Sequence, residues 1–286
     1  DDRAADHVAS EANGTLTILH AHRTVCAEAA VAPGEEVVDG RAIEIGFEVE
    51  LEGSPGPVRP QELEVQTFTT DMDYLYSRCC TPAYDPRAKE VAEATVNVLR
   101  TAGATFGILG EAEAYEEAAV HKNVCTSPHC LLTFRKEYLE EFESAFQPIH
   151  QTQLFADFIS KQRITPTKPL GKKVVFHDPC TLGRASGIYD EPRDVLRAIP
   201  DLELVEIPHY SREYSLCCGG GSGGMWVERQ KGERLSDLRV EQAAATGADI
   251  LAVACPYCLQ MFEDSVKTMD LSLEVKDVTE LLAESL

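Results

Sequence analysis

Hydrophobic positions recur along this chain with two different periods, and segments of the two kinds alternate. Short continuous apolar runs predict buried strands, and apolar residues repeated every three or four positions predict helices. Between residues 71 and 165 the pattern predicts strands over 73–78 and 104–109 and helices over 86–102, 128–142 and 153–159. After residue 165 it predicts strands over 173–177, 202–207 and 249–254 and helices over 191–199, 225–246, 256–269 and 277–286. Strands that alternate with helices in this way predict parallel sheets flanked by helices.

The two predicted α/β segments are similar to each other in sequence. YDPR at 84–87 resembles YDEPR at 189–193, SPHC at 127–130 resembles CPYC at 255–258, and residues 153–159 resemble 280–286. Between the first two of these segments the first copy is more than twenty residues shorter than the second. We therefore expect an α/β protein made of two tandem, duplicated cysteine-rich domains, with a degenerate first copy.

The repeat also predicts domain boundaries. Residues 1–70 form an N-terminal segment that is partly β, since 41–51 alternate between apolar and polar positions before a Gly- and Pro-rich turn at 53–57. We expect the degenerate domain over 71–165 and the intact domain over 166–286.

The charge of the chain narrows the classes of partner. Its 286 residues include 26 Lys plus Arg and 48 Asp plus Glu, which gives a net charge of −22. Such a surface repels phosphate, so we expect no nucleic-acid binding. No apolar run reaches 18 residues, so we expect no membrane span in this chain. Residues 1–6 lack an initiator Met and the regions of a signal peptide. We therefore expect a processed chain or a fragment that is located in the cytoplasm. Any association with a membrane is expected to occur through a partner subunit.

Ten cysteines without a secretion signal indicate metal or redox chemistry rather than a disulfide framework. Five belong to the second copy: Cys180, Cys217, Cys218, Cys255 and Cys258. They lie at three places, each at the end of a predicted strand or in the loop after it. Because the carboxyl ends of parallel strands share one edge of the sheet, we expect the three places to converge.

The type of ligand limits what such a site can bind. Thiolates suit iron–sulfur clusters, zinc and Cu(I), and five thiolates exceed the four that a tetrahedral zinc ion needs. Gly219, Gly220 and Gly221 follow the Cys-Cys pair, where glycine allows close backbone approach and N–H donation to sulfur. An iron–sulfur cluster is therefore the first hypothesis. The alternatives are a zinc-stabilised structural or interaction domain without redox activity, and a metal-free dithiol at Cys255 and Cys258.

Four segments of the second copy carry a resemblance to a known family. They are HDPCTLGR at 177–184, SLCCGGG at 215–221, GMW at 224–226 and VACPYC at 253–258. They resemble the cysteine-rich CCG domain of heterodisulfide reductase, in its B- and D-type subunits, and of the iron–sulfur subunits of glycolate, lactate and anaerobic glycerol-3-phosphate oxidoreductases. The resemblance covers about residues 71–286 and is absent from 1–60.

The resemblance implies a [4Fe–4S] cluster of noncubane type, bound by all five cysteines of the second copy. It also implies an iron–sulfur electron-transfer subunit of a multi-subunit oxidoreductase, which reduces a disulfide or accepts electrons from 2-hydroxy-acid oxidation. The tandem ferredoxin motif that often precedes these domains is absent from the sequence. We therefore expect a flavoprotein or ferredoxin-type iron–sulfur partner, or a part of the protein outside this sequence, to exchange electrons with it.

The first copy departs from the family pattern. It has no Cys-Cys-Gly, and Ser127 stands at a motif-cysteine position, so we do not expect a second cluster of the same kind. Cys80 and Cys130 remain as candidates for another metal site.

Four further positions carry expectations. His177, three residues before Cys180, is the candidate proton or hydrogen-bond donor beside the cluster, and His129 is a candidate ligand. Trp226 is expected to pack in the core at the start of the helix over 225–246. Lys173, with the lysines at 168 and 172, is expected to form a docking surface beside the cluster strand.

Overall fold

The computed structural model describes residues 11–12, 15–18, 29–31, 64–77, 81, 85–109, 120–138, 147–227 and 229–286, with side chains from residue 64 onward. Its contacts divide the chain into two compact units, 1–56 and 57–286. In the first unit the short strands β1 (Glu11–Ala12), β2 (Thr15–Ile18) and β3 (Ala29–Val31) form an antiparallel sheet. The strand predicted over 41–51 lies outside the described residues.

The second unit contains two four-stranded parallel sheets with the same topology. The first has the order β5-β4-β6-β7 and the second the order β11-β10-β8-β9. Their strands are β4 (Tyr74–Ser77), β5 (Phe106–Gly107), β6 (Lys122–Cys125), β7 (Gln147–His150), β8 (Lys172–Phe176), β9 (Leu202–Val205), β10 (Ile250–Val253) and β11 (Glu274–Asp277). Numbered within its own half, each sheet has the strand order 2-1-3-4. The α/β duplication predicted from the sequence is therefore confirmed; the boundaries predicted at 70 and 165 stay a prediction.

Helices connect the strands in corresponding places of the two halves. The first half has α2 (Pro86–Thr101), α3 (Pro128–Thr133), a π-helical turn η2 (Phe134–Tyr138) and α5 (Gln151–Ser160). The second has α6 (Asp190–Arg197), the 3₁₀ turns η3 (Arg212–Tyr214) and η4 (Gly224–Trp226), α7 (Leu235–Ala244), α8 (Pro256–Met269) and α9 (Val278–Ser285).

Local sequence explains where the equivalent helices begin. Helices α3 and α8 both start with a proline, preceded by Ser127 and Cys255 respectively as the N-cap. Helices α5 and α9 both start with a capping box, in which His150 and Asp277 accept backbone hydrogen bonds at the N-cap. The two halves thus share their helix-start signals as well as their strand order.

The core of the second half is its two central strands. All four residues of β10 are buried, and so are the last three of β8. Strands covered on both faces read as continuous apolar runs, which is why the sequence pattern identified them. The edge strands β7 and β11 are only four residues long and alternate more exposed with buried positions without an alternation of polar and apolar residues, so the sequence pattern did not predict them.

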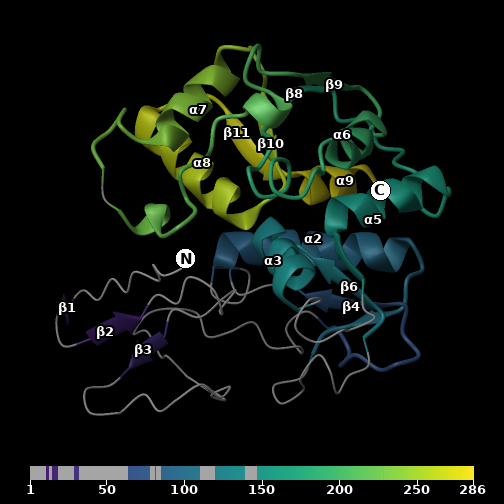
Figure 1. Cartoon of the computed structure of the whole chain (residues 1–286). Helices are drawn as coiled ribbons and strands as arrows, with labels where there is room; N and C mark the ends of the chain where they lie inside the picture. The colour runs from purple at the N-terminus through teal and green to yellow at the C-terminus, as the bar shows by residue number, and fades with distance from the viewer. Residues whose placement is uncertain are drawn as a thin grey trace. The chain divides into compact units, whose positions relative to one another are not determined.

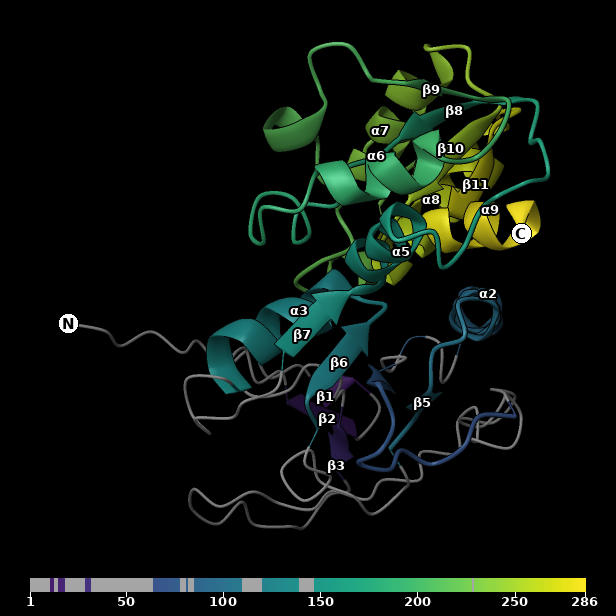
Figure 2. The same cartoon turned by 90° about the vertical axis from the view of Figure 1, so that its right-hand side faces the viewer.

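The two halves pack through their helices. Helix α2 of the first half packs against α9 of the second, and α5 of the first packs against α6 of the second. Figures 1 and 2 show α2, α5 and α9 lying between the two sheets. The crossed pairing follows from the equivalent positions of these helices in the duplicated fold.

The helix predicted over 225–246 is wrong in its first half. Helix α7 begins only at Leu235, and before it the chain forms the turn η4 and an irregular loop. Gly232 has a φ of 85°, a left-handed conformation that no α-helix contains, and its N–H donates to Asp237 at 2.8 Å. Trp226 consequently lies on this loop with 67% of its surface exposed, so its predicted place in the core is also wrong.

Candidate metal centre

Three connections bring the five cysteines of the second half to the carboxyl edge of its sheet. Cys180 follows β8, Cys217 and Cys218 lie in the long connection between β9 and β10, and Cys255 and Cys258 occupy the N-cap and first turn of α8, directly after β10. Since β8, β9 and β10 are parallel, their carboxyl ends share one edge.

The five sulfur atoms form a continuous series of contacts. The Sγ atoms of Cys180 and Cys217 are 3.8 Å apart. Side-chain hydrogen bonds then link Cys217 with Cys218, Cys218 with Cys258, and Cys258 with Cys255. Cys218, Cys255 and Cys258 are buried, whereas Cys180 and Cys217 are half-buried, so the group meets the surface on the side of the latter two.

The glycine loop supplies backbone donors to this group. Gly219 N–H donates to Cys217 Sγ at 3.3 Å, and Gly220 N–H donates to Cys218 Sγ at 3.5 Å. Gly221 closes the loop instead, because its carbonyl accepts the N–H of Gly224 at 3.0 Å. A Cβ at Gly224 would lie 2.0 Å from the Gly219 carbonyl oxygen, so the loop requires glycine there.

Hydrogen bonds among the cysteines lower the pKa of some thiols and raise the pKa of others. Hydrogen bonds from Cys217 and Cys258, with the Gly220 N–H, lower the pKa of Cys218 to about 5 although burial opposes this. Its hydrogen bond with Cys217 and burial raise the pKa of Cys180. Burial acts to raise the pKa of Cys255, but hydrogen bonds from Cys258 and His129 hold it well below the ordinary value. Hydrogen bonds with Cys218 and Cys255, together with burial, raise the pKa of Cys258 well above its ordinary value. The site therefore favours thiolate, the form that binds metal, at Cys218 and Cys255, while Cys180 and Cys258 retain their protons.

One residue of the first half reaches this site. His129, on α3, lies with Nε2 3.2 Å from Thr181 Oγ1 and hydrogen-bonds Cys255. Its ring packs edge-on against Tyr257, with centroids 4.9 Å apart. The sequence placed His129 in the degenerate first copy; the structure places it beside the cysteines of the second.

A buried polar layer lies behind the cysteines. His177 is completely buried at the end of β8, and burial, with the charges of Arg239 and Arg184, holds its pKa well below the ordinary value. Arg239 on α7 is also completely buried and donates from Nε to His177 Nδ1 at 3.1 Å. Arg193 on α6 pairs with Asp178 through two hydrogen bonds of 2.6 and 2.9 Å. Sequence reasoning missed Arg239, which reads as part of the polar face of a helix.

The first half brings no comparable group together among its described residues. Cys125 and Cys130 are buried on β6 and α3, and Cys80 lies outside the described part of the chain. At the edge where the cysteines stand in the second half, Tyr76 hydroxyl lies 3.0 Å from Thr126 Oγ1, and His150 Nε2 lies 3.1 Å from the Thr126 carbonyl. A metal site at Cys80 and Cys130 stays a prediction.

The lysines expected to flank the site lie elsewhere. Lys172 and Lys173 begin β8, whereas Cys180 follows its end, so these lysines are at the opposite edge of the sheet. Lys173 Nζ donates to the Thr246 carbonyl at 2.9 Å. The docking surface predicted there is therefore not beside the cysteines.

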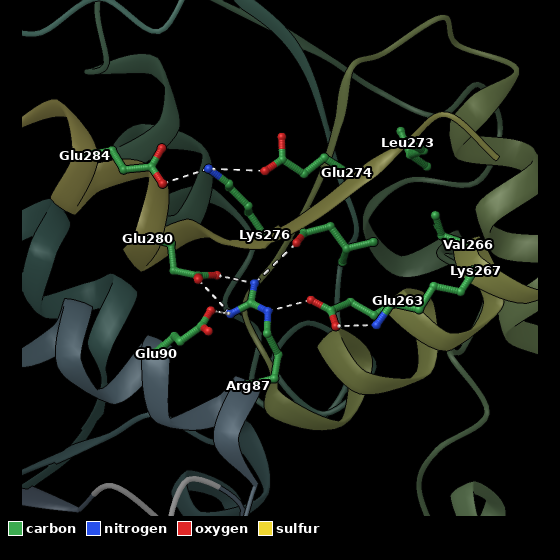
Figure 3. Close-up of a pocket in the computed structure, with 11 residues that line it drawn as sticks. Arg87, Glu90, Glu263, Val266, Lys267, Leu273, Glu274, Lys276, Glu280 and Glu284 are labelled. Carbon is green, nitrogen blue, oxygen red and sulfur yellow. Dashed lines mark hydrogen bonds and ion pairs between the residues drawn. The ribbon is translucent and has the colours of Figure 1, made fainter. Parts of the chain in front are cut away.

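A separate cavity of about 440 Å³ lies where α2 of the first half meets α8, β11 and α9 of the second. Figure 3 shows the guanidinium of Arg87 inside it, between Glu280 and Glu263. Arg87 donates to both Glu280 carboxylate oxygens, at 2.7 and 2.9 Å, and to Glu263 at 2.5 Å. Arg87 and the two glutamates are paired with one another. These ion pairs therefore link the two halves and leave the guanidinium of Arg87 occupied rather than available to a ligand.

The donor set of the cysteine group fits an iron–sulfur cluster. Five thiols are more than one zinc ion takes, and two of them receive backbone N–H donors of the kind that stabilise cluster sulfur. Within the described part of the chain, no three His, Cys, Asp or Glu side chains surround a point suited to a single metal ion. The same part of the chain has no helix long and apolar enough to cross a membrane.

Known proteins resemble this chain in sequence. Residues 174–263 match the family model described as "CCG: Cysteine-rich domain". The chain is 33% identical to the "Probable iron-sulfur-binding oxidoreductase FadF" of Bacillus subtilis, over 81% of this chain and 36% of that protein. It is 31% identical to the "EtfAB:quinone oxidoreductase" of Syntrophomonas wolfei, over 74% of this chain and 34% of that protein.

A third relative comes from an archaeon. The chain is 32% identical to the D-type subunit of "Dihydromethanophenazine:CoB--CoM heterodisulfide reductase" of Methanosarcina barkeri, over 75% of this chain and 59% of that protein. The chain thus spans between about a third and three fifths of the length of these curated relatives. Residues 174–263 therefore carry a CCG cysteine-rich domain, and the chain is similar in sequence to proteins named as iron–sulfur oxidoreductases and heterodisulfide reductase subunits.

Proposed function

We propose that this chain is an iron–sulfur electron-transfer part of a multi-subunit oxidoreductase, with one [4Fe–4S] cluster of noncubane type held by Cys180, Cys217, Cys218, Cys255 and Cys258. The observation that carries the proposal is the continuous series of five thiols, drawn from three separate loops to one sheet edge. A lone Cys-x-x-Cys would also suit a dithiol or zinc, whereas a fifth thiol in contact with the others requires a larger group.

When bound, such a cluster accepts and donates single electrons at a potential set by its surroundings. The chain supplies those surroundings. The N–H groups of Gly219 and Gly220 donate to Cys217 and Cys218, and the buried layer behind them excludes water from one side. His129 contributes a hydrogen bond to Cys255 from the first half. The degenerate half therefore acts as a wall of the site in the second half.

The relatives bear on the partners we propose. One is named an EtfAB:quinone oxidoreductase, and another is named as part of a CoB–CoM heterodisulfide reductase. We propose that this chain likewise exchanges electrons with a flavoprotein or a ferredoxin-type iron–sulfur partner. In one alternative it passes them to a disulfide, and in the other it accepts them from the oxidation of a 2-hydroxy acid. The half-buried side of the site, at Cys180 and Cys217, is where an acceptor would approach.

Anaerobic purification followed by iron, acid-labile sulfide and zinc analysis tests the proposal. We expect about four iron and four sulfide per chain, and a changed electron paramagnetic resonance (EPR) signal in the Cys218→Ser variant because the fifth thiolate is lost. Stoichiometric zinc without sulfide would instead support the zinc-stabilised domain. Thiol–disulfide exchange that survives chelation would support the metal-free dithiol at Cys255 and Cys258.

A further inference from the structure

The protonation of His177 is fixed by its neighbour. Arg239 Nε carries a hydrogen and donates it to His177 Nδ1 at 3.1 Å, so Nδ1 must be the acceptor nitrogen of the ring. A neutral imidazole with Nδ1 as acceptor carries its proton on Nε2. Burial lowers the pKa of His177 well below its ordinary value, so the ring is neutral. His177 thus presents one N–H donor, at Nε2.

That donor is buried and has no hydrogen-bond partner among the described protein atoms. Leaving such a group unpaired costs roughly 1–3 kcal/mol, so a persistent case calls for an acceptor that binds there. The ring packs edge-on against Phe262, with centroids 4.7 Å apart, one helical turn after Cys258 on α8. His177 also lies three residues before Cys180. His177 therefore lies just before the loop that carries Cys180 and packs against the helix that carries Cys258.

Arg239 is a buried cation whose hydrogen-bond partners are all neutral. Besides His177 it donates to the Tyr210 carbonyl, to Gln242 Oε1 and to Ser215 Oγ, at 2.9–3.0 Å. No carboxylate of the described residues forms an ion pair with it. Burial lowers the pKa of Arg239 to about 10, opposed by the charges of Asp178, Cys258 and Glu206, so it stays protonated at neutral pH.

The acidic residues nearby form their hydrogen bonds with Arg193 rather than with Arg239. Asp178 is fully paired with the buried Arg193. Glu206 also pairs with Arg193, and its side chain is 42% exposed, so water screens it. A buried guanidinium with no carboxylate in hydrogen-bond contact is costly unless an anion lies within the same low-dielectric region. Cys258, whose ionised form would favour the protonated guanidinium of Arg239, belongs to the cysteine group, in which hydrogen bonds lower the pKa of Cys218 and Cys255.

We infer that Arg239 and His177 are a positioning pair for the cluster: Arg239 balances its negative charge and orients His177, whose Nε2–H donates a hydrogen bond to the sulfur group. The inference rests on the proposed function and adds to it the residues that set the cluster's potential. Hydrogen bonds and positive charge near a cluster favour its more negative, reduced state and so raise its reduction potential.

Redox titration of the full chain, followed by EPR after anaerobic reconstitution, tests the pair. His177→Phe keeps the aromatic volume but has no donor, so we expect a midpoint potential shifted to more negative values. His177→Gln places an amide N–H near the position of Nε2, so we expect a midpoint close to the wild-type value. Arg239→Met removes the charge and the constraint on the ring, and we expect a larger negative shift than in His177→Phe.

A matched control comes from the same helix region. Arg234, at the N-cap of α7, pairs with the exposed Asp264, and Arg234→Met should leave the midpoint unchanged. If Arg239→Met does not fold, the His177 variants carry the test in protein labelled with ¹⁵N-histidine. A His129→Phe background removes the other histidine, which contacts Cys255, and there pulsed EPR should detect a nitrogen coupling that His177→Phe abolishes.

The outcomes separate this inference from the function on which it rests. Iron-loaded variants with wild-type midpoints, or a nitrogen coupling unchanged in His177→Phe, overturn the positioning pair and leave the cluster in place. Wild-type protein that takes up no iron and sulfide contradicts the proposed function and the pair together.

Discussion

The two halves of the second unit share one topology and differ at one edge. Strand order, the proline-led helices α3 and α8, and the capping boxes of α5 and α9 occur in both. At the carboxyl edge, Ser127 and His129 stand in the first half where Cys255 and Tyr257 stand in the second. A duplicated scaffold thus tolerates the loss of its binding residues while its fold is kept.

The largest difference between the halves is the connection before the third strand. Strand β5 ends at Gly107 and β6 begins at Lys122, whereas β9 ends at Val205 and β10 begins at Ile250. The longer connection contains the Cys217-Cys218 pair, the glycine loop and α7 with Arg239. The length of this connection therefore accounts for two of the five thiols, Cys217 and Cys218, and the replacement of Cys255 by Ser127 accounts for a third difference.

Removing equivalent cysteines should have opposite outcomes. Cys258 and Cys130 occupy the same place on α8 and α3, and Cys258 forms hydrogen bonds with Cys218 and Cys255 of the five-cysteine group. We expect Cys258→Ser to lower iron occupancy by roughly 10–100-fold, the loss typical of a weakened metal site, and Cys130→Ser to leave occupancy unchanged. Iron and sulfide per chain are the measurement. A Cys130→Ser variant that loses iron would show that the first half also binds metal.

Glycine substitutions should separate stability from cluster binding. A Cβ at Gly224 would meet the Gly219 carbonyl oxygen at 2.0 Å and so displace the N–H that donates to Cys217. A Cβ at Gly107, in the first sheet, would meet the Phe68 backbone at 2.4 Å. We expect either change to alanine to cost about 1–3 kcal/mol of stability, as overpacking does, but only Gly224→Ala to lower iron occupancy.

The control for this comparison lies in the same loop. The nearest atom to a Cβ at Gly221 would be His129 Nε2 at 4.0 Å, so Gly221→Ala should retain iron. Thermal unfolding and iron content of the three variants provide the measurements. Equal iron loss in Gly221→Ala and Gly224→Ala would mean that the loop's flexibility, rather than this close approach, matters.

The sequence predicted the thiols better than their surroundings. Cysteine spacing and buried strands such as β10 identified the site edge, because both depend on local pattern. The contact of His129 with Cys255 depends on how the two halves pack. The burial of Arg239 depends on the packing of α7 against His177 and against the connection that carries Tyr210 and Ser215. Residues brought together by tertiary packing leave no local periodicity to read.

The two equivalent capping residues should give opposite pH dependences. Burial lowers the pKa of His150 to about 3, so the unfolded state binds a proton first and stability falls as pH drops below about 6.5. Burial raises the pKa of Asp277 to about 7, so the folded state holds a proton and stability falls as pH rises from about 4 to 7. In the wild type the two slopes oppose each other.

Replacing either residue with asparagine removes its own contribution to the pH dependence of stability and leaves the contribution of the other residue. Relative to wild type, His150→Asn should gain stability as pH falls from 6.5 to 5, and Asp277→Asn should gain it as pH rises from 5 to 7, by about 2 kcal/mol each. Urea unfolding followed by circular dichroism between pH 5 and 8 measures both differences. A difference from wild type that does not vary with pH would mean that the residue does not titrate in this range.

Variants of the two contacts that join the halves should show the smallest difference in stability from each other. Arg87 on α2 pairs with Glu280 on α9, and at the equivalent place Gln153 on α5 donates to Glu191 on α6 at 3.3 Å. Arg87 is 22% exposed and leaves two carboxylates facing each other when removed, so Arg87→Met should cost about 1–2 kcal/mol, less than a fully buried pair. Gln153→Ala breaks a single hydrogen bond to a partly exposed carboxylate and should cost about 0.5–1 kcal/mol. The double variant Arg87→Met with Glu280→Gln should recover part of the loss; if it does not, the ion pair contributes nothing and helix packing alone joins the halves.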